Sequence, residues 1–290
     1  MAALTLLCHG KMNWMLRVLG RREDGFHELE TLFQSVSLHD LLTIRESSAF
    51  SFHCSNASVP VGNDNLVVRA ARSLTDDGTV PPVSIELDKR IPAGGGLGGG
   101  SADAALALMG INELLRLGRT RDELGALALT LGSDVPFFLL GGTAWATGRG
   151  EKLVPMESPK AIPLLFVFPE FSISTKEAFG WLGRGPTDQF EPPLGLLRCR
   201  AAVKGGMFSH AAELTNDFEE PVFTRHPELA AVKKRLLDAG ASWSAMTGSG
   251  STIVGAFPDR KRRDRAEDSM KELRTAPGET IDRARAIPFM

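Results

Sequence analysis

A run of glycines between residues 92 and 101 is the segment of this sequence best suited to chemistry. Six of the seven residues 94–100 are glycine, and the pattern of a helix follows at once. Glycine lets backbone N–H groups approach an anion without obstruction by a Cβ atom, and the first turn of a helix adds unpaired donors and a positive dipole end. We call residues 92–101 the glycine loop and predict that it binds the phosphates of a nucleotide. The residues expected at the nucleotide are Pro92, Gly94, Gly95, Gly96, Leu97, Gly98, Gly99, Gly100 and Ser101.

Two other kinds of nucleotide-binding loop fit this segment poorly. A Walker loop ends in Gly-Lys-Ser or Gly-Lys-Thr, whereas Gly100 is followed by Ser-Ala-Asp. Gly94, Gly96 and Gly99 match the Gly-x-Gly-x-x-Gly fingerprint of dinucleotide-binding folds, but the acidic residue expected about 20 positions later falls on helical sequence. A flexible linker is a third interpretation, although such linkers are rarely followed at once by a regular helix.

The composition is that of a globular protein with room for two domains. The chain has 290 residues, of which 43% are hydrophobic and 23% charged, and its formal net charge is −2. Acidic and basic residues are interspersed, which argues against nucleic acid or a membrane as the partner. We find no signal peptide, transit peptide or membrane-spanning run. The three cysteines are far apart and lack metal-ligand spacing, which suits a reducing compartment, so we expect a cytoplasmic protein.

The pattern of strands and helices divides the chain into two unlike halves. The first quarter is mostly extended, and Asn65 begins a helix. The glycine loop is preceded by a short strand over residues 83–87 and followed by an amphipathic helix. Thr120 and Glu123 form a capping box at the start of the next helix.

Beyond about residue 158 the pattern becomes β-α-β-β-α-β, which predicts a ferredoxin-like layer. The expected elements are a strand over 163–168, a helix near Lys176, an irregular segment over 183–206, a helix from 226 to 240, strands over 243–247 and 252–257, a charged helix over 259–271 and a final strand over 281–287. We therefore predict an α+β protein with an N-terminal domain at residues 1–158 and a C-terminal domain at 159–290.

Three separate segments together resemble those of the GHMP kinases. They are Lys11-x-Asn13 with Gly20-Arg21-Arg22-x-Asp24-Gly25-Phe26-His27, the glycine loop, and Thr247-Gly248-Ser249-Gly250-Ser251. The first of these, together with Ser133-Asp134-Val135-Pro136-Phe137-Phe138, is similar to the members of that superfamily that phosphorylate 4-diphosphocytidyl-2-C-methyl-D-erythritol. The resemblance implies a two-domain GHMP kinase fold with the active site in the cleft between the domains.

The resemblance also implies transfer of the γ-phosphoryl group of ATP to an acceptor hydroxyl, with Mg²⁺ as cofactor. It assigns catalysis to Asp134, which accepts the proton, and Lys11, which holds that carboxylate ionised and orients the acceptor. On its residues alone, Asp134 could also be a helix cap or a turn residue. Without a Walker lysine, the triphosphate depends on loop amides, Ser101 and Mg²⁺, and Ser101 is the candidate protein ligand of the metal.

The remaining candidates follow from the same resemblance. Those implied to bind the acceptor are Asn13, Phe26, His27, Gly248 and Ser249. Phe26 stacks on cytosine and His27 recognises its polar edge; relatives often carry tyrosine in place of Phe26, and stacking survives that change. Asn65 and Leu66 are implied to lie near adenine, although Asn65 alone is an ordinary helix N-cap.

Two alternatives stay open. A GHMP kinase acting on another small alcohol, such as homoserine or mevalonate, would share the fold, but these acceptors carry no base for Phe26 and His27 to bind. A nucleotide-binding protein without catalysis, either a sensor or an NAD-type binder, is less compatible with the presence of both Lys11 and Asp134.

Overall fold

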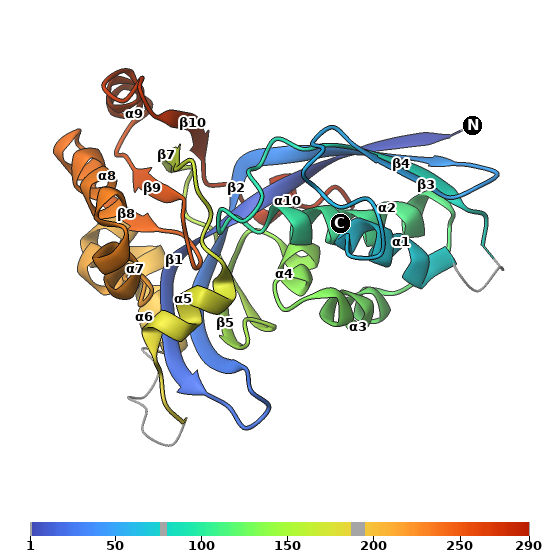
Figure 1. Ribbon diagram of the computed structural model, residues 1–290, viewed down its shortest axis with the longest axis horizontal. Coiled ribbons are helices and arrows are strands. Elements are labelled where there is room, and N and C mark those ends of the chain that lie inside the picture. The colour runs from blue at the N-terminus through green and yellow to red at the C-terminus, as the bar shows by residue number, and fades with distance from the viewer. Residues whose placement is uncertain (1, 76–79, 187–194, 290) are drawn as a thin grey trace.

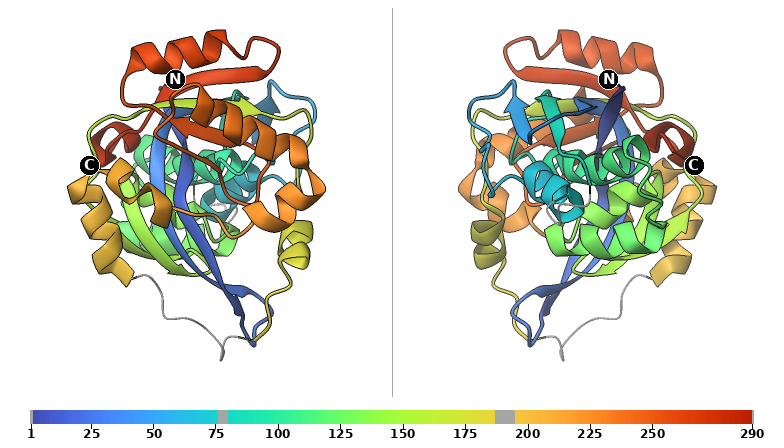
Figure 2. Two further views of the ribbon diagram at one scale, coloured as in Figure 1. Left: turned by 90° about the vertical axis from the view of Figure 1, so that its left-hand side faces the viewer. Right: turned by 90° about the vertical axis from the view of Figure 1, so that its right-hand side faces the viewer.

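The computed structural model describes residues 2–75, 80–186 and 195–289, which form two β-sheets and the helices packed on them (Figure 1). The first sheet is built on a long hairpin that runs through both halves of the molecule (Figure 2). The second strand of the hairpin, β2 (His27–Glu46), is central. Along one edge it pairs with β1 (Ala3–Arg21), and at the two ends of the other edge it pairs with β4 (Val83–Asp88) and β5 (Thr143–Gly148). The sheet also contains β3 (Ser51–Cys54) and β6 (Lys152–Met156).

Helices cover one face of this sheet. They are α1 (Leu66–Thr75), α2 (Gly99–Leu114), α3 (Arg121–Leu131) and α4 (Val135–Leu140). The expected capping box of Thr120 and Glu123 begins α3, and Asn65 caps α1 through the N–H of Val67. The prediction of an amphipathic α2 is wrong, because the sheet covers one side of this helix and α1, α3 and α4 surround the others. Its many alanines allow this close packing on all sides.

The second sheet has the strand order β10-β7-β9-β8 with antiparallel neighbours. Its strands are β7 (Pro163–Phe168), β8 (Trp243–Met246), β9 (Ile253–Ala256) and β10 (Arg274–Glu279), and the helices of this half include α5 (Thr175–Leu182), α7 (Glu219–Arg225), α8 (Pro227–Asp238) and α9 (Arg260–Asp268). This order is that of a ferredoxin-like layer and confirms the prediction. Apolar residues of α7, α8 and α9 pack on one face. The other face packs on the β1–β2 hairpin, where the rings of Trp14 and Trp243 lie 4.8 Å apart.

The segment expected to be irregular contains a helix, α6 (Gly195–Gly205), followed by a 3₁₀-helix at Met207–Glu213. Residues 187–194 of that segment lie outside the described part of the chain. Cys199 and Ala202 of α6 are buried against the same core as Trp14 and Trp243. This contact stabilises a helix that the local sequence, flanked by glycines, did not indicate.

The last strand is β10, not the predicted segment Ile281–Ile287. Pro277 and Gly278 disfavour a strand in isolation, but β10 is an edge strand, where proline is tolerated. A Cβ on Gly278 would lie 2.8 Å from the Phe166 ring, so glycine allows the two strands to approach. Ile281 and Ile287 are buried in the core of the first half instead, on either side of the short helix α10 (Arg283–Ala286).

Each half contributes residues to the hydrophobic core of the other half. Met12 and Trp14 of β1 belong to the core of the second sheet, whereas Ile281 and Ile287 belong to that of the first. The division of the chain at residue 158 therefore stays a prediction. Within the described residues, no helix is both long and apolar enough to cross a membrane.

A buried ion cluster joins both ends of the glycine loop to β2. The ammonium of Lys89, before the loop, donates to Asp40 and, at 2.9 Å, to Oδ2 of Asp103 in α2. Asp40 Oδ1 also accepts from the backbone N–H groups of Arg90 and Ile91, at 2.5 and 2.7 Å. Burial raises the pKa of Asp103 to about 7, against the opposing charge of Lys89. This cluster, which we call the Asp40–Lys89–Asp103 cluster, fixes where the loop leaves the sheet and where it enters α2.

Gly110 is the position at which α2 approaches the first sheet, and we predict that Gly110→Val destabilises the protein. A Cβ there would lie 2.7 Å from the terminal methyl carbons of both Ile44 and Leu6, which are buried. Overpacking should lower the free energy of unfolding by about 1–3 kcal/mol, measured by urea denaturation. Gly125→Ala in α3 is the control: its Cβ meets nothing within 4 Å, so it should be neutral or stabilising by about 0.5–1 kcal/mol. Equal stability of the two variants would contradict this packing.

Asp103→Asn should flatten the dependence of stability on pH. The pKa of Asp103 in the folded protein, about 7, is higher than that of an unfolded aspartate. The contribution of this carboxyl group to the free energy of unfolding is therefore complete below about pH 4 and is lost as the pH rises through 7. We expect the Tm of Asp103→Asn, relative to that of the wild type, to rise as the pH is raised from 5 to 8. Asp122→Asn, at an exposed position, serves as the control. Parallel curves for Asp103→Asn and wild type would contradict the prediction.

Candidate active site

A cleft of about 1610 Å³ separates the helices of the first half from α5 and the hairpin between β8 and β9. Every residue that the sequence predicted for the site lies on its wall. These are Lys11, Asn13, Phe26, His27, Asn65, Leu66, Pro92, Gly94, Gly95, Gly96, Leu97, Gly98, Gly99, Gly100, Ser101, Asp134, Gly248 and Ser249. Segments that are distant in the sequence therefore meet around one space large enough for two ligands.

The glycine loop follows one wall of this cleft. Gly96 has a φ of +79°, and a Cβ at this position would lie 2.1 Å from the carbonyl oxygen of Thr247, so only glycine fits. Gly98, also in the left-handed region, is the N-cap residue of α2, and among the described residues no side chain caps this helix. The N–H groups of its first turn are thus free to bind an anion, as expected of a phosphate-binding loop.

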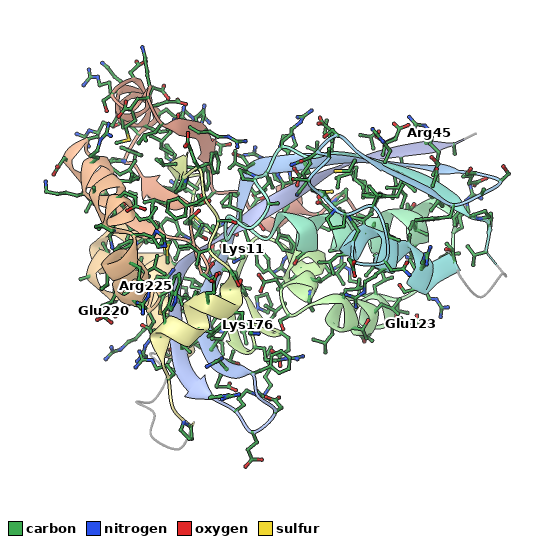
Figure 3. All side chains as sticks on the ribbon, viewed as in Figure 1. Lys11, Arg45, Glu123, Lys176, Glu220 and Arg225 are labelled. Carbon is green, nitrogen blue, oxygen red and sulfur yellow. The ribbon has the colours of Figure 1, made fainter. Side chains whose placement is uncertain are left out.

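Lys11 lies near the middle of the molecule, where the two halves meet (Figure 3). Its buried ammonium donates to Asn13 Oδ1 at 2.9 Å and lies 3.6 Å from Asp134 Oδ2. Burial lowers the pKa of Lys11, and the charge of Asp134 opposes this effect. The Asp134 side chain is 34% exposed, so its carboxylate reaches from the lysine into the cleft. This pair can hold a hydroxyl group and accept its proton.

Local backbone geometry positions both members of the pair. Pairing between β1 and β2 shifts register between His9 and Lys11, a bulge that changes the direction of the strand. The bulge residue Gly10 allows the Lys11 N–H to donate to the Leu97 carbonyl at 2.9 Å. Asp134 is the residue before α4, at the turn where α3 ends.

Asn13 connects Lys11 to the opposite wall of the cleft. As expected from their spacing, the two side chains lie together. Asn13 Oδ1 also accepts from Gly248 N–H at 3.1 Å and from the Thr247 hydroxyl at 3.3 Å, while Nδ2 donates to Thr31 at 2.7 Å. The amide therefore holds the hairpin against β1, a positioning role that the sequence did not predict.

The far end of the cleft is aromatic. Phe26, in the turn between β1 and β2, is 50% exposed, and the Arg149 guanidinium lies 4.4 Å from its ring centroid. His27 stacks on Phe179 of α5, with ring centroids 4.3 Å apart and an angle of 14° between the planes. Burial, aided by the charge of Arg21, lowers the pKa of His27, which favours the neutral ring, a form that can accept as well as donate a hydrogen bond.

Sequence reasoning missed several residues of this site. Phe179 belongs to the helix predicted near Lys176, but only the tertiary structure places its ring against His27. Arg149 is far from Phe26 along the chain, so the sequence did not indicate that the two side chains are in contact. Thr175 of α5 shares a hydrogen bond of 3.0 Å with Ser249, which ties α5 to the second-half hairpin.

Comparison with protein families gives two matches. A family described as "GHMP kinases N terminal domain" matches residues 65–142, which include the glycine loop and Asp134. A family described as "GHMP kinases C terminal" matches residues 198–274, which include Gly248 and Ser249. Together these confirm the resemblance suggested by the three segments.

Individual relatives cover nearly the whole chain. The 4-diphosphocytidyl-2-C-methyl-D-erythritol kinase of Moorella thermoacetica is 40% identical over 277 residues, which are 94% of this chain and 96% of the relative. That of Pelotomaculum thermopropionicum is 42% identical over 259 residues, 88% of this chain and 90% of the relative.

Solved structures agree with the fold. A crystal structure of 4-(cytidine 5'-diphospho)-2C-methyl-D-erythritol kinase has a TM-score of 0.82 and 35% identity, and the match covers 96% of this chain and 99% of that one. Homoserine kinase from Cytophaga hutchinsonii, with a TM-score of 0.71, 20% identity and coverage of 97% and 95%, shares the fold alone. The predicted two-domain GHMP kinase fold is confirmed, and the chain belongs to the 4-diphosphocytidyl-2-C-methyl-D-erythritol kinase family of the GHMP kinases.

Proposed function

We propose that this chain transfers the γ-phosphoryl group of ATP to the 2-hydroxyl of 4-diphosphocytidyl-2-C-methyl-D-erythritol, giving the 2-phosphate and ADP. Membership of the GHMP kinases indicates an ATP-dependent kinase. The acceptor is the compound in the names of the relatives, and its phosphorylation belongs to the non-mevalonate route to isopentenyl diphosphate. The observation that supports catalysis by this chain is the buried Lys11 ammonium 3.6 Å from Asp134, beside a glycine loop with free amides.

Asp134 is the proposed base. As the acceptor oxygen bonds to the γ-phosphorus, the bond from phosphorus to the β–γ bridging oxygen breaks, ADP leaves, and the hydroxyl proton passes to the Asp134 carboxylate. Lys11 pairs with this carboxylate and fixes its direction, because the ammonium is itself held by Asn13. Phosphoryl transfer also requires the hydroxyl to be placed in line with the leaving group and the charge of the phosphates to be stabilised.

The nucleotide is assigned to the glycine loop. The amides of the first turn of α2 and the Ser101 hydroxyl face the cleft and suit a triphosphate. Both polar ends of the Asn65 side chain are engaged, by the Val67 N–H and the Pro60 carbonyl, so contact with adenine falls to backbone groups and to Leu66.

Mg²⁺ is the proposed cofactor. The described residues contain no group of three His, Cys, Asp or Glu side chains able to hold a metal ion. A hydroxyl ligand from Ser101 fits an ion whose other ligands are phosphate oxygens and water. When bound, Mg²⁺ neutralises charge on the phosphates.

The acceptor is assigned to the side of Phe26 and His27. A half-exposed aromatic ring suits stacking of cytosine, and a neutral histidine suits its polar edge. Homoserine and mevalonate contain no base and would leave both groups without a function. The cytoplasmic location rests on the three cysteines, which are free and buried.

The acceptor is tested by an assay of ADP release with 4-diphosphocytidyl-2-C-methyl-D-erythritol, homoserine and mevalonate in parallel. We expect turnover with the first acceptor alone. Turnover of only homoserine or mevalonate would keep the fold and overturn the assignment of Phe26 and His27. ATP binding without turnover of any acceptor would support the non-catalytic alternative.

Asp134→Asn should lower kcat by about 10²–10⁴-fold, because the amide cannot accept the hydroxyl proton. The rise in Tm on adding ATP should be kept, since Asp134 is not assigned to the nucleotide. Asp122→Asn, in the exposed first turn of α3, controls for the loss of a charge. A kcat for Asp134→Asn within a few-fold of wild type would rule out its role as base.

Phe26→Ala should raise the acceptor KM by about tenfold or more, because one stacked base contributes about 1–3 kcal/mol. The KM for ATP and the kcat should change little. Phe26→Tyr keeps the ring and should keep the acceptor KM. An unchanged KM for Phe26→Ala would show that the cytosine binds elsewhere.

A further inference from the structure

Arg149 lies between the two ends of the proposed acceptor site. It belongs to the turn between β5 and β6, with glycine on either side, and its N–H donates to Glu151 at 2.5 Å. Its guanidinium lies on the ring of Phe26, 4.4 Å from the centroid. The next residue approaches the base, since a Cβ on Gly150 would lie 3.7 Å from Asp134 Oδ1. The Arg149 turn thus connects the ring proposed for cytosine to the carboxylate proposed for the reacting hydroxyl.

The acceptor carries a diphosphate between its cytidine and its methylerythritol. With cytosine at Phe26 and the 2-hydroxyl at Asp134, the diphosphate must cross the space between them. A diphosphate in a partly closed cleft needs cationic or N–H donors, and a guanidinium forms paired hydrogen bonds to phosphate oxygens.

The other cationic side chains of the cleft are less suited to this task. Three have carboxylate partners: Lys11, Lys89 and Arg184. Arg21 and Lys176 line the cleft but are exposed. Within the described residues Arg149 has no salt bridge, and its contact with Phe26 holds the charge in place without neutralising it.

Nearby acidic groups do not cancel this charge. Arg149 acts on Asp24, whose pKa is lowered chiefly by its hydrogen bond with Arg22 and only weakly by the charge of Arg149. The Glu151 carboxylate accepts from the backbone of Arg149 rather than from its guanidinium. The guanidinium therefore keeps its capacity for an external anion.

We propose that Arg149 is a specificity-determining residue that binds the diphosphate of the acceptor and so selects a nucleoside diphosphate conjugate over smaller alcohols. This inference rests on the proposed function, and it deepens it by assigning a cationic partner to the diphosphate of the acceptor.

The test uses cytidine, CMP and CDP as competitive inhibitors of wild type and Arg149→Met. Methionine keeps an apolar contact with Phe26 but removes the charge. In the wild type we expect affinity to rise with each phosphate. In Arg149→Met we expect cytidine to bind as before, CDP to bind about tenfold or more weakly, and the acceptor KM to rise in parallel, with kcat and the KM for ATP little changed.

Two further variants keep the result interpretable. Arg149→Lys retains the charge and should retain part of the preference for CDP, which shows that a loss in Arg149→Met is not misfolding. Arg45→Met removes an arginine at the far end of the molecule (Figure 3), where it pairs with Glu86, and should bind all three inhibitors as the wild type does.

The outcomes separate this inference from the proposed function. Equal weakening of cytidine and CDP in Arg149→Met would mean that Arg149 only supports the ring of Phe26, and an unchanged preference for CDP would mean that it does not touch the diphosphate. Either result overturns the inference while turnover of the cytidyl acceptor by wild type upholds the function. A wild type that neither binds CDP nor turns over that acceptor overturns both.

Discussion

The burial of one ammonium group, that of Lys11, constrains most of this structure. A buried charge is costly unless it is paired and hydrogen-bonded, so partners must be brought to it. Asn13 comes from the same strand, but Asp134 comes from the turn between α3 and α4, which must therefore pack beside the middle of β1. The glycine loop must pass the same point, because the N–H of Lys11 donates to Leu97. Lys11 thus joins the first strand to the proposed base through its ammonium and to the proposed nucleotide loop through its backbone N–H.

The second half is joined to this centre by a close approach of backbones. Gly96 has room for no side chain beside the Thr247 carbonyl, and Asn13 accepts from Gly248. The loop proposed for the nucleotide and the hairpin proposed for the acceptor are consequently fixed to each other as well as to β1. A cleft bounded by such contacts can hold two ligands at a set distance, which is what an in-line transfer requires.

The sequence predicted the features that depend on local chemistry. The glycine loop, the shared face of Lys11 and Asn13 and the capping box at Thr120 are all of this kind. The ferredoxin-like strand order is long-range, and it was predicted because the order of strands and helices along the chain is typical of that fold. The features it missed depend on tertiary contacts. Helix α6 is stabilised by a core from elsewhere, β10 tolerates Pro277 because it lies at an edge, and the stacking of His27 on Phe179 joins two halves of the chain.

Within the described residues, the lysine beside the glycine loop is paired with carboxylates, whereas the arginine near Phe26 is not. The absence of a Walker lysine from the sequence indicated only the first half of this contrast. Lys89, just before the glycine loop, lines the cleft, but its ammonium is buried and held by two carboxylates in the Asp40–Lys89–Asp103 cluster, so its charge is already paired. The loop therefore offers a nucleotide mainly the dipoles of backbone amides, whose strength depends on their alignment. Alignment in turn depends on how firmly the loop ends are held, and Asp40 holds both Arg90 and Ile91 by their N–H groups. The buried ion cluster thus supports the proposed nucleotide site through the rigidity of the loop, while the guanidinium of Arg149 carries the charge proposed for the acceptor.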